Sequence, residues 1–160
     1  MNNSVLTDKS NLYNCTGCSV CAASCPQKAI DIKLTRDGFY EPTINEEKCT
    51  DCGMCKKSCY KFEENVLQRN TDDCKFYSAI NKDSNELETT TSGGVSSELM
   101  KQCIQEGYMV LGVAYDYEKN IAVTKISRTI NELEQFKGSK YFQSFTFDAL
   151  YEALNDRSEQ

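Results

Sequence analysis

The sequence of 160 residues contains no histidine and no tryptophan. Histidine is the commonest general base of enzymes, so its absence removes the usual acid–base and nucleophile–base pairs. No stretch of about eighteen apolar residues is present, and we therefore expect no membrane-spanning helix. The N-terminus also lacks a positively charged segment followed by an apolar one. We therefore expect no secretory signal, and a cytoplasmic protein.

The charge balance is acidic, with a formal net charge of −6. An acidic surface disfavours nucleic acid and suits protein partners that have basic docking faces. The length suggests one ordinary domain or two small ones, and 39% hydrophobic residues are enough for a core. These features favour a protein that works with a protein partner.

Cysteine is abundant: the chain has ten, and eight of them form two runs with the same spacing, C-x2-C-x2-C-x3-C. Each cysteine of the second run follows its counterpart in the first by 34 residues, so the runs are an internal repeat. Cys74 and Cys103 stand outside the runs. The first run is Cys15, Cys18, Cys21 and Cys25, and the second is Cys49, Cys52, Cys55 and Cys59.

This spacing is typical of proteins with two [4Fe-4S] clusters, in which the fourth cysteine of each run binds the other cluster. The small residues of the first run, such as Gly17 and Ala22, allow the backbone to come close to a cluster. We therefore predict two [4Fe-4S] clusters with crossed ligands. The first is assigned to Cys15, Cys18, Cys21 and Cys59, and the second to Cys49, Cys52, Cys55 and Cys25.

The alternative metal is zinc, since two C-x2-C pairs can form a tetrahedral site with four thiolates. One zinc site would leave half of the cysteines without a role, and disulfides are not expected in a chain without a secretory signal. Asp51, Lys56 and Lys57 lie within the second run and surround the second cluster, whereas the first cluster lies among neutral residues. The sequence therefore predicts different local charge at the two clusters, without giving the sign of the difference in their potentials.

Periodicity predicts an α+β fold. An N-terminal two-cluster ferredoxin-like module at 1–64 and a linker at 65–74 precede a partial α/β domain at 75–160. Asp37-Gly38 marks a hairpin turn, and Thr129 with Glu132 forms a capping box. The apolar run at 108–115 is expected to be a buried central strand. Strands are expected at 29–34, 39–44, 75–80, 108–115 and 121–126, and helices at 95–106, 129–136 and 147–154.

The order of motifs resembles one family. After the cysteine runs come Lys75-Phe-Tyr-Ser-Ala, Thr91-Ser-Gly-Gly at the start of a helix, and Gly138-Ser-Lys-Tyr141. This order resembles the coenzyme F-420 hydrogenase/dehydrogenase beta-subunit family, in particular its bacterial members with an N-terminal double 4Fe-4S module. Members of that family continue well past the last motif. We therefore expect this chain to hold a truncated flavin domain, as a short paralogue, a split-gene product or a fragment.

The resemblance implies a flavin, FAD or FMN, that exchanges electrons with the clusters. It places six residues near that flavin, although a helix cap at the Gly-Gly loop and a solvated lysine are alternatives that the residues leave open. The partner would be a redox protein or the remainder of the flavin domain. The six residues are Ser92, Gly93, Gly94, Gly138, Ser139 and Lys140.

Three functions follow from these patterns. The first is an iron–sulfur electron-transfer protein or subunit that serves a flavin or deazaflavin oxidoreductase partner. The second is a flavin-dependent oxidoreductase in its own right, in which the clusters supply the flavin. The third is a non-catalytic remnant. Whether the chain is an enzyme, and which residues would be catalytic, is left open by the sequence.

Overall fold

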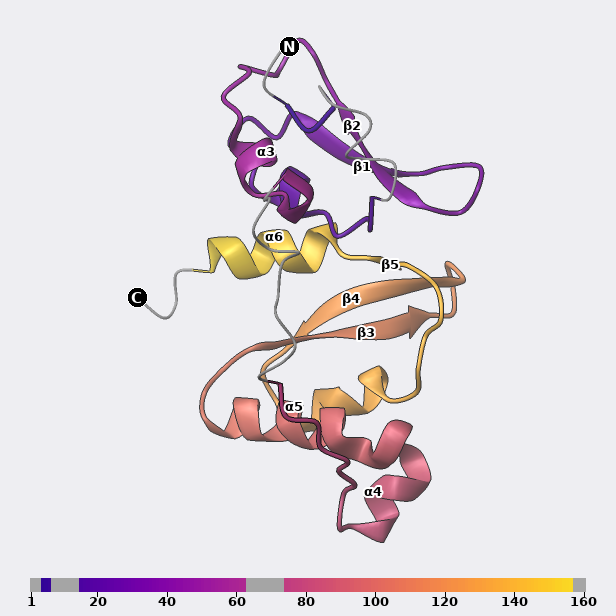
Figure 1. The fold of residues 1–160 in the computed structure, drawn as a ribbon. Coiled ribbons are helices and arrows are strands. Elements are labelled where there is room, and N and C mark those ends of the chain that lie inside the picture. Colours follow the sequence, from indigo (N-terminus) through magenta and orange to yellow (C-terminus); the bar gives the residue numbers. More distant parts are fainter. Residues whose placement is uncertain (1–3, 7–14, 63–73, 157–160) are drawn as a thin grey trace. The chain divides into compact units, whose positions relative to one another are not determined.

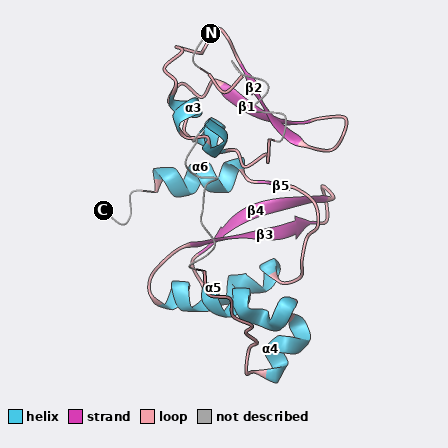
Figure 2. Ribbon diagram, in the orientation of Figure 1, coloured by secondary structure: helices cyan, strands magenta, loops and turns pink. Residues whose placement is uncertain are grey.

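The computed structural model describes residues 4–6, 15–62 and 74–156 (Figure 1). The chain divides into two compact units. One consists of residues 1–72 together with 145–160, and the other of residues 73–144. Both units mix helices and strands (Figure 2), as an α+β fold requires. In the part of the chain that is described, no helix is long and apolar enough to span a membrane.

The first unit is built around a hairpin. Strands β1 and β2 pair antiparallel from Ile30 opposite Ile44 to Leu34 opposite Tyr40. The turn closes at Gly38, whose φ of 83° is readily adopted only by glycine. Both expected strands of this module are therefore present. The elements are α2 (Val20–Ala23), β1 (Ile30–Leu34), β2 (Tyr40–Ile44), α3 (Met54–Lys57), the 3₁₀ helix η1 (Tyr60–Phe62) and α6 (Phe147–Asn155).

The C-terminal helix α6 (yellow in Figure 1) lies in this first unit, although it is the last helix of the chain. Its residue Phe147 packs against a core formed by Val5, Ala22, Ile30 and Cys55. The expected domain at 75–160 ran to the end of the chain, and the structure differs from it in this helix. The physical reason is that the apolar face of α6 is covered by the small core of the cysteine module.

The second unit centres on the antiparallel pair β3 and β4, which runs from Val110 opposite Ser127 to Asp116 opposite Ile121. Gly112 allows close packing, since a Cβ at this position would lie 2.4 Å from the ring of Phe136. The elements are α4 (Ser84–Thr89), η2 (Ser92–Gly94), α5 (Val95–Gln105), β3 (Val110–Asp116), β4 (Ile121–Ser127), η3 (Ile130–Phe136) and β5 (Ser144–Phe145).

Strand β3 corrects one expectation. The sheet order is β3-β4-β5, so β3 lies at an edge and is not the central strand that its apolar run predicted. Burial alternates along it: Val110 and Ala114 are buried, whereas Leu111 and Val113 are only partly so. One face of β3 therefore packs against the core, and the other is only partly covered, as is common in antiparallel sheets.

The segment before α5 also differs from expectation. Residues 74–80 form no strand, and Phe76 and Tyr77 are 88% and 84% exposed. Helix α4, at 84–89, was not predicted because its sequence is polar. It is started by Asp83, whose carboxylate accepts a hydrogen bond from the Asn85 N–H at 2.9 Å. This helix buries no residue, and its start is therefore set by the N-cap hydrogen bond.

The remaining predicted elements are present. The helix at 95–106 is α5, followed by Gly107 with a φ of 89° as its stop. The capping box of Thr129 and Glu132 forms, and the helix that it starts is a 3₁₀ helix, η3. The strand at 121–126 is β4. These are the elements with the strongest local patterns.

Candidate metal centre

The two cysteine runs fold into the same backbone. Each loop has two residues with left-handed φ, at the same places in the run: Gly17 and Ser19 in the first, Asp51 and Gly53 in the second. Each pair is followed by one short helix, α2 or α3, and these begin 34 residues apart. Left-handed residues turn the chain sharply. The repeat in sequence is therefore also a repeat in structure.

Each loop curls around a separate space lined by four thiols. Three of the four come from the loop itself, and the fourth comes from the end of the other run. We call the two spaces site 1 and site 2. Site 1 is lined by Cys15, Cys18, Cys21 and Cys59, and site 2 by Cys25, Cys49, Cys52 and Cys55.

This is the grouping that crossed ligation requires, and it is set by α2 and α3. Cys21 lies in α2 and lines site 1, whereas Cys25 follows that helix by two residues and lines site 2. In the second run, Cys55 lies in α3 and lines site 2, whereas Cys59 follows that helix and lines site 1. Each short helix therefore spans from one site to the other. The role of these thiols as ligands remains a prediction.

The thiols of site 1 influence one another electrostatically. Burial raises the pKa of Cys21 to about 12, with smaller contributions from the nearby Cys18, Cys15 and Cys59. The pKa of Cys59 is also raised, mainly by burial. Thiolates crowded in a poorly solvated space repel one another, so the protonated form is favoured. A metal group that supplies positive charge would reverse this preference.

The donors around the thiols suit an anionic metal group. The Ala29 N–H donates a hydrogen bond to Cys25 Sγ at 3.4 Å, a contact that stabilises negative charge on sulfur. The positive charge of Lys61 acts on Cys59 and opposes the rise in its pKa. Asp51 lines site 2. Among the described residues, no three His, Cys, Asp or Glu side chains converge to hold a single metal ion.

One thiol of each site is open to solvent. Cys18 of site 1 and Cys52 of site 2 are exposed, and they are the second cysteine of their runs. Cys55 is buried, and the other thiols of the two runs are intermediate. Electrons reach a buried group most easily where its ligands approach the surface. Cys18 and Cys52 therefore mark where a partner would come closest to each site.

The N-terminal residues contribute more than the sequence indicated. Val5 is completely buried in the core between α2 and β1, and it lines site 1. Ser4 lines site 2. Of the polar segment 1–14, the structure describes residues 4–6. The apolar pair Val5-Leu6 inside a polar stretch is the pattern that could have indicated this packing.

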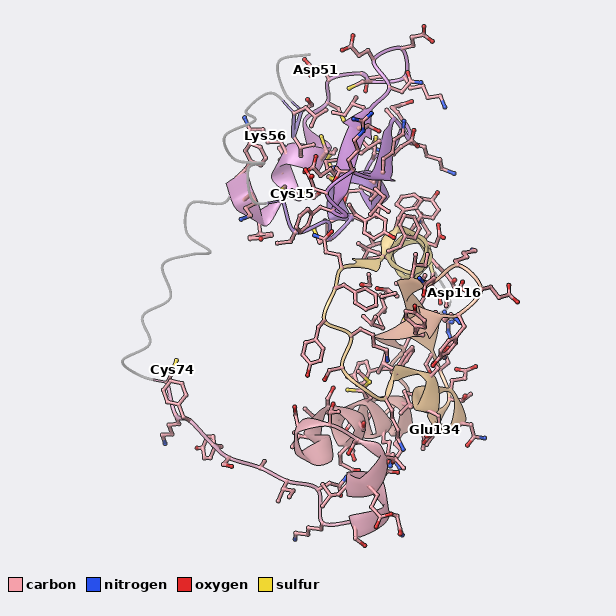
Figure 3. The ribbon with its side chains drawn as sticks, turned by 90° about the vertical axis from the view of Figure 1, so that its right-hand side faces the viewer. Cys15, Asp51, Lys56, Cys74, Asp116 and Glu134 are labelled. Atoms are coloured by element: carbon pink, nitrogen blue, oxygen red, sulfur yellow. The ribbon has the colours of Figure 1, made fainter. Side chains whose placement is uncertain are left out.

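The two remaining cysteines, Cys74 and Cys103, belong to the second unit. Cys74 is exposed at the start of the extended segment that leads to α4 (Figure 3). Cys103 is partly buried on α5. Neither lines site 1 or site 2. Figure 3 also labels Cys15, Asp51 and Lys56 on the module that holds the two ligand loops.

The second unit contains a cavity of about 280 Å³ at the start of α5. Four of the six residues that the resemblance placed near a flavin line it: Ser92, Gly94, Gly138 and Ser139. The two segments are joined by a hydrogen bond of 3.1 Å between the hydroxyls of Thr91 and Ser139. Hydroxyl groups from both segments therefore face one cavity.

Gly93 and Lys140 do not line this cavity. Gly93 packs against the chain before α4, where a Cβ would lie 3.0 Å from the carbonyl oxygen of Ala79. Lys140 Nζ donates to the carbonyl oxygens of Phe136 and Lys137, at 3.2 and 2.8 Å. Burial lowers its pKa. Lys140 therefore caps the end of η3.

The charged groups near the cavity are paired. Lys137, which lines it, lies 2.8 Å from Glu134 and 3.4 Å from Glu86. Glu86 also pairs with Lys101 at 2.7 Å. The pKa of Glu86 is lowered, chiefly by its hydrogen bond with Lys101. Hydroxyl and backbone groups, more than unpaired charge, therefore define what this cavity could bind.

Comparison with known proteins agrees with the geometry of the cysteine loops. Residues 14–62 match the family model of a 4Fe-4S dicluster domain. The chain is 38% identical over 47 residues to the ferredoxin-type protein NapF of Escherichia coli, which is 29% of each chain. It is 40% identical over 65 residues to the ferredoxin-type protein NapG of the same organism, 34% of this chain and 28% of that one.

A third relative belongs to the Na⁺-translocating ferredoxin:NAD⁺ oxidoreductase complex of Acetobacterium woodii, and it is 45% identical over 49 residues. Those residues are 31% of this chain and 14% of that protein. The chain thus spans less than a third of the length of these relatives. Its N-terminal part, residues 14–62, is a 4Fe-4S ferredoxin-type domain.

Proposed function

We propose that residues 15–59 bind two [4Fe-4S] clusters, one at site 1 and one at site 2, and that the protein passes electrons between them and a redox partner. The observation that carries this proposal is the grouping of eight thiols into two sets of four, each completed by the other run. A single zinc site would leave one complete set unused. A [4Fe-4S] cluster, when bound, accepts and releases one electron at a potential set by its surroundings.

The residues of the chain supply what such a group needs. Eight cysteines provide thiolates, and the Ala29 N–H donates a hydrogen bond to one of them, Cys25. Helix α2 carries Cys21 of site 1, and Cys25 of site 2 follows it closely. The two sites are thereby joined by one short helix and the two residues that follow it. This proximity favours rapid electron exchange between them.

Analysis of iron and sulfide tests the proposal. Protein purified without oxygen should contain about eight iron atoms and eight sulfides per chain. Replacing Cys74 and Cys103 with alanine serves as the matched control and should leave both numbers unchanged, since neither thiol lines a site. Stoichiometric zinc without iron, or four irons in the unchanged protein, would contradict it.

A second candidate function is a flavin-dependent oxidoreductase, and the cavity at the start of α5 favours it. Its volume of about 280 Å³ is close to the lower end of small-molecule sites. Backbone N–H groups at the start of α5 could donate hydrogen bonds to a phosphate. Under this proposal Ser92, Gly94, Gly138 and Ser139 contact the flavin, and Gly93 and Lys140 hold the two segments in place.

Flavin binding can be separated from the clusters. Gly94 has a φ of 70°, and a Cβ there would lie 2.8 Å from Thr90 Oγ1. Gly94→Ala should therefore weaken binding of FAD and FMN, measured by fluorescence quenching, and leave the iron content unchanged. Gly107→Ala is the control, because Gly107 has a similar φ of 89° with nothing within 4 Å. Failure of the unchanged protein to bind either flavin would exclude this function.

The wider assignments are part of the same proposal. We infer membership of the coenzyme F-420 hydrogenase/dehydrogenase beta-subunit family from the motif order, with a redox protein or the rest of a flavin domain as partner. The names of the relatives include one component of an oxidoreductase complex and one iron–sulfur component of a CoB–CoM heterodisulfide reductase. We also infer a cytoplasmic location, where cysteines stay reduced and can bind metal.

A further inference from the structure

The turn that follows Cys25 aims a backbone donor at the sulfur of this ligand. Lys28 N–H donates to the Cys25 carbonyl oxygen at 3.1 Å, which closes the turn. The next residue, Ala29, then donates its N–H to Cys25 Sγ at 3.4 Å. This geometry needs Lys28 in the left-handed region, with a φ of 48°. A lysine adopts that conformation at an energetic cost, so the turn depends on other contacts.

One such contact comes from the far end of the chain. The ammonium of Lys28 lies 5.1 Å from the centre of the Tyr151 ring, in the position of a cation–π interaction. Tyr151 belongs to α6, and its ring lies 5.7 Å from that of Phe147. Phe147 is in turn packed against the core of the cysteine module. The ring that holds Lys28 is thus itself held in place.

We propose that Tyr151 is a positioning residue for site 2: its ring holds Lys28, and thereby the turn that directs the Ala29 N–H at Cys25 Sγ. This inference rests on the proposed binding of a cluster at site 2. An N–H group that faces a ligand sulfur stabilises the more negative, reduced form and so raises the reduction potential. Helix α6 would then set the potential of site 2 from about 125 residues away in sequence.

The same arrangement predicts that the two sites respond differently. The hydrogen bond concerns Cys25, which lines site 2 only. Loss of the Tyr151 ring should therefore lower the potential of site 2 and leave that of site 1 unchanged. If α6 had only a structural role, the result would differ, because Phe147 of this helix packs against a core shared by both loops. Loosening of that core would change the reduction potentials of both sites together.

The experiment measures the potential of each site alone. Cys18→Ala leaves site 2 intact, and Cys52→Ala leaves site 1 intact. In each background, reduction of the full chain is followed by electron paramagnetic resonance at controlled potential. Tyr151→Ala should shift the signal of site 2 to more negative potential and should not shift that of site 1. Tyr151→Phe keeps the ring but loses the hydroxyl, which also forms a hydrogen bond with Lys28, so it should shift the potential of site 2 less than Tyr151→Ala does.

A second substitution tests the route through Lys28. Glycine adopts left-handed φ without cost, so Lys28→Gly keeps the turn and no longer needs the ring. Lys28→Gly also removes a positive charge, so the potential of site 2 in this variant is the reference value. Adding Tyr151→Ala to it should not change the potential of site 2 any further. A full shift in the double variant would overturn the proposal.

The controls separate the possible failures. Tyr77→Ala removes an aromatic ring that is 84% exposed in the other unit, and both potentials should stay unchanged. Equal shifts at both sites, or none at either, would overturn the role of Tyr151. Absence of iron from the unchanged protein would instead refute the proposed function. If Tyr151→Ala does not fold, Tyr151→Leu provides an apolar replacement with the same expected shift.

Discussion

The two ligand loops reach one backbone with different residues. At the first left-handed position the first loop has Gly17 and the second has Asp51, and at the next position the first has Ser19 and the second Gly53. Each loop therefore contains one glycine and one residue that adopts this conformation at a cost. The Ser19 hydroxyl donates to the Gly17 carbonyl oxygen at 3.2 Å, which offsets part of that cost. Equivalent positions of the two loops therefore share the left-handed conformation whether or not they are occupied by glycine.

The loops differ most in their charge. The positive charge of Lys61 acts on Cys59 at site 1, whereas Asp51 lines site 2. In sequence Asp51, Lys56 and Lys57 lie within the second run. This pattern predicted charged residues around the second cluster and neutral residues around the first. Crossed pairing brings Cys59 to site 1, and its neighbour Lys61 comes with it. The structure thus divides between the two sites a charge pattern that lies together in sequence.

The largest effect is expected from the crossing cysteines. Cys59→Ala should abolish the cluster at site 1 and Cys25→Ala that at site 2, because each removes the fourth thiol of the set that the other loop begins. Each variant should retain about four of about eight irons. The surviving signal identifies the site. If Cys59→Ala instead removes the cluster held by Cys49, Cys52 and Cys55, the crossing is wrong.

A substitution at a left-handed position comes next. Gly17→Val should destabilise the fold by about 1–2 kcal/mol, since a branched side chain is strained at a φ of 65°. Gly17→Asp should cost less, because Asp51 occupies the equivalent position in the other loop. Chemical denaturation of the iron-free protein, followed by circular dichroism, measures both. Equal losses for the two variants would mean that the loops are not equivalent.

The thiols of site 1 predict a dependence on pH in the iron-free protein. Cys21 has a pKa of about 12 when folded and about 9.0 when unfolded. Its contribution to stability is therefore complete below pH 9 and is lost as the pH rises toward 12. The slope is at most about 1.4 kcal/mol per pH unit for one thiol. Cys21→Ala should flatten the decline seen in denaturation midpoints between pH 9 and pH 12, and an unchanged decline would contradict the assignment.

The smallest effect should come from the charges. Lys61→Gln removes positive charge near Cys59 and should lower the potential of site 1. Asp51→Asn removes negative charge from the lining of site 2 and should raise the potential there. Each shift should correspond to about 1 kcal/mol or less, as for other solvent-screened charges. Redox titration measures both, and shifts of the same sign would show that the two charges do not act on separate sites.

Sequence patterns predicted the local elements well. The hairpin of β1 and β2, the helix α5 with its stop at Gly107 and the capping box at Thr129 all depend on a few neighbouring residues. Two predictions in the second unit were wrong. Residues 75–80 have strand-forming side chains and make no strand, and β3 is an edge strand. A strand exists only with a partner, and the choice of partner is not a local property.

The sequence by itself determined the eight thiols, their division into two runs and the repeat that relates them, since ligand spacing is set by what a short loop can span. The tertiary structure decided which thiols share a site, which charge lies beside each, and where the ends of the chain pack. Val5 and Phe147 come from opposite ends and meet in the core next to the ligand helices. Such contacts depend on shape and burial across the whole unit, and a local apolar pattern such as Val5-Leu6 indicates burial without identifying the partner.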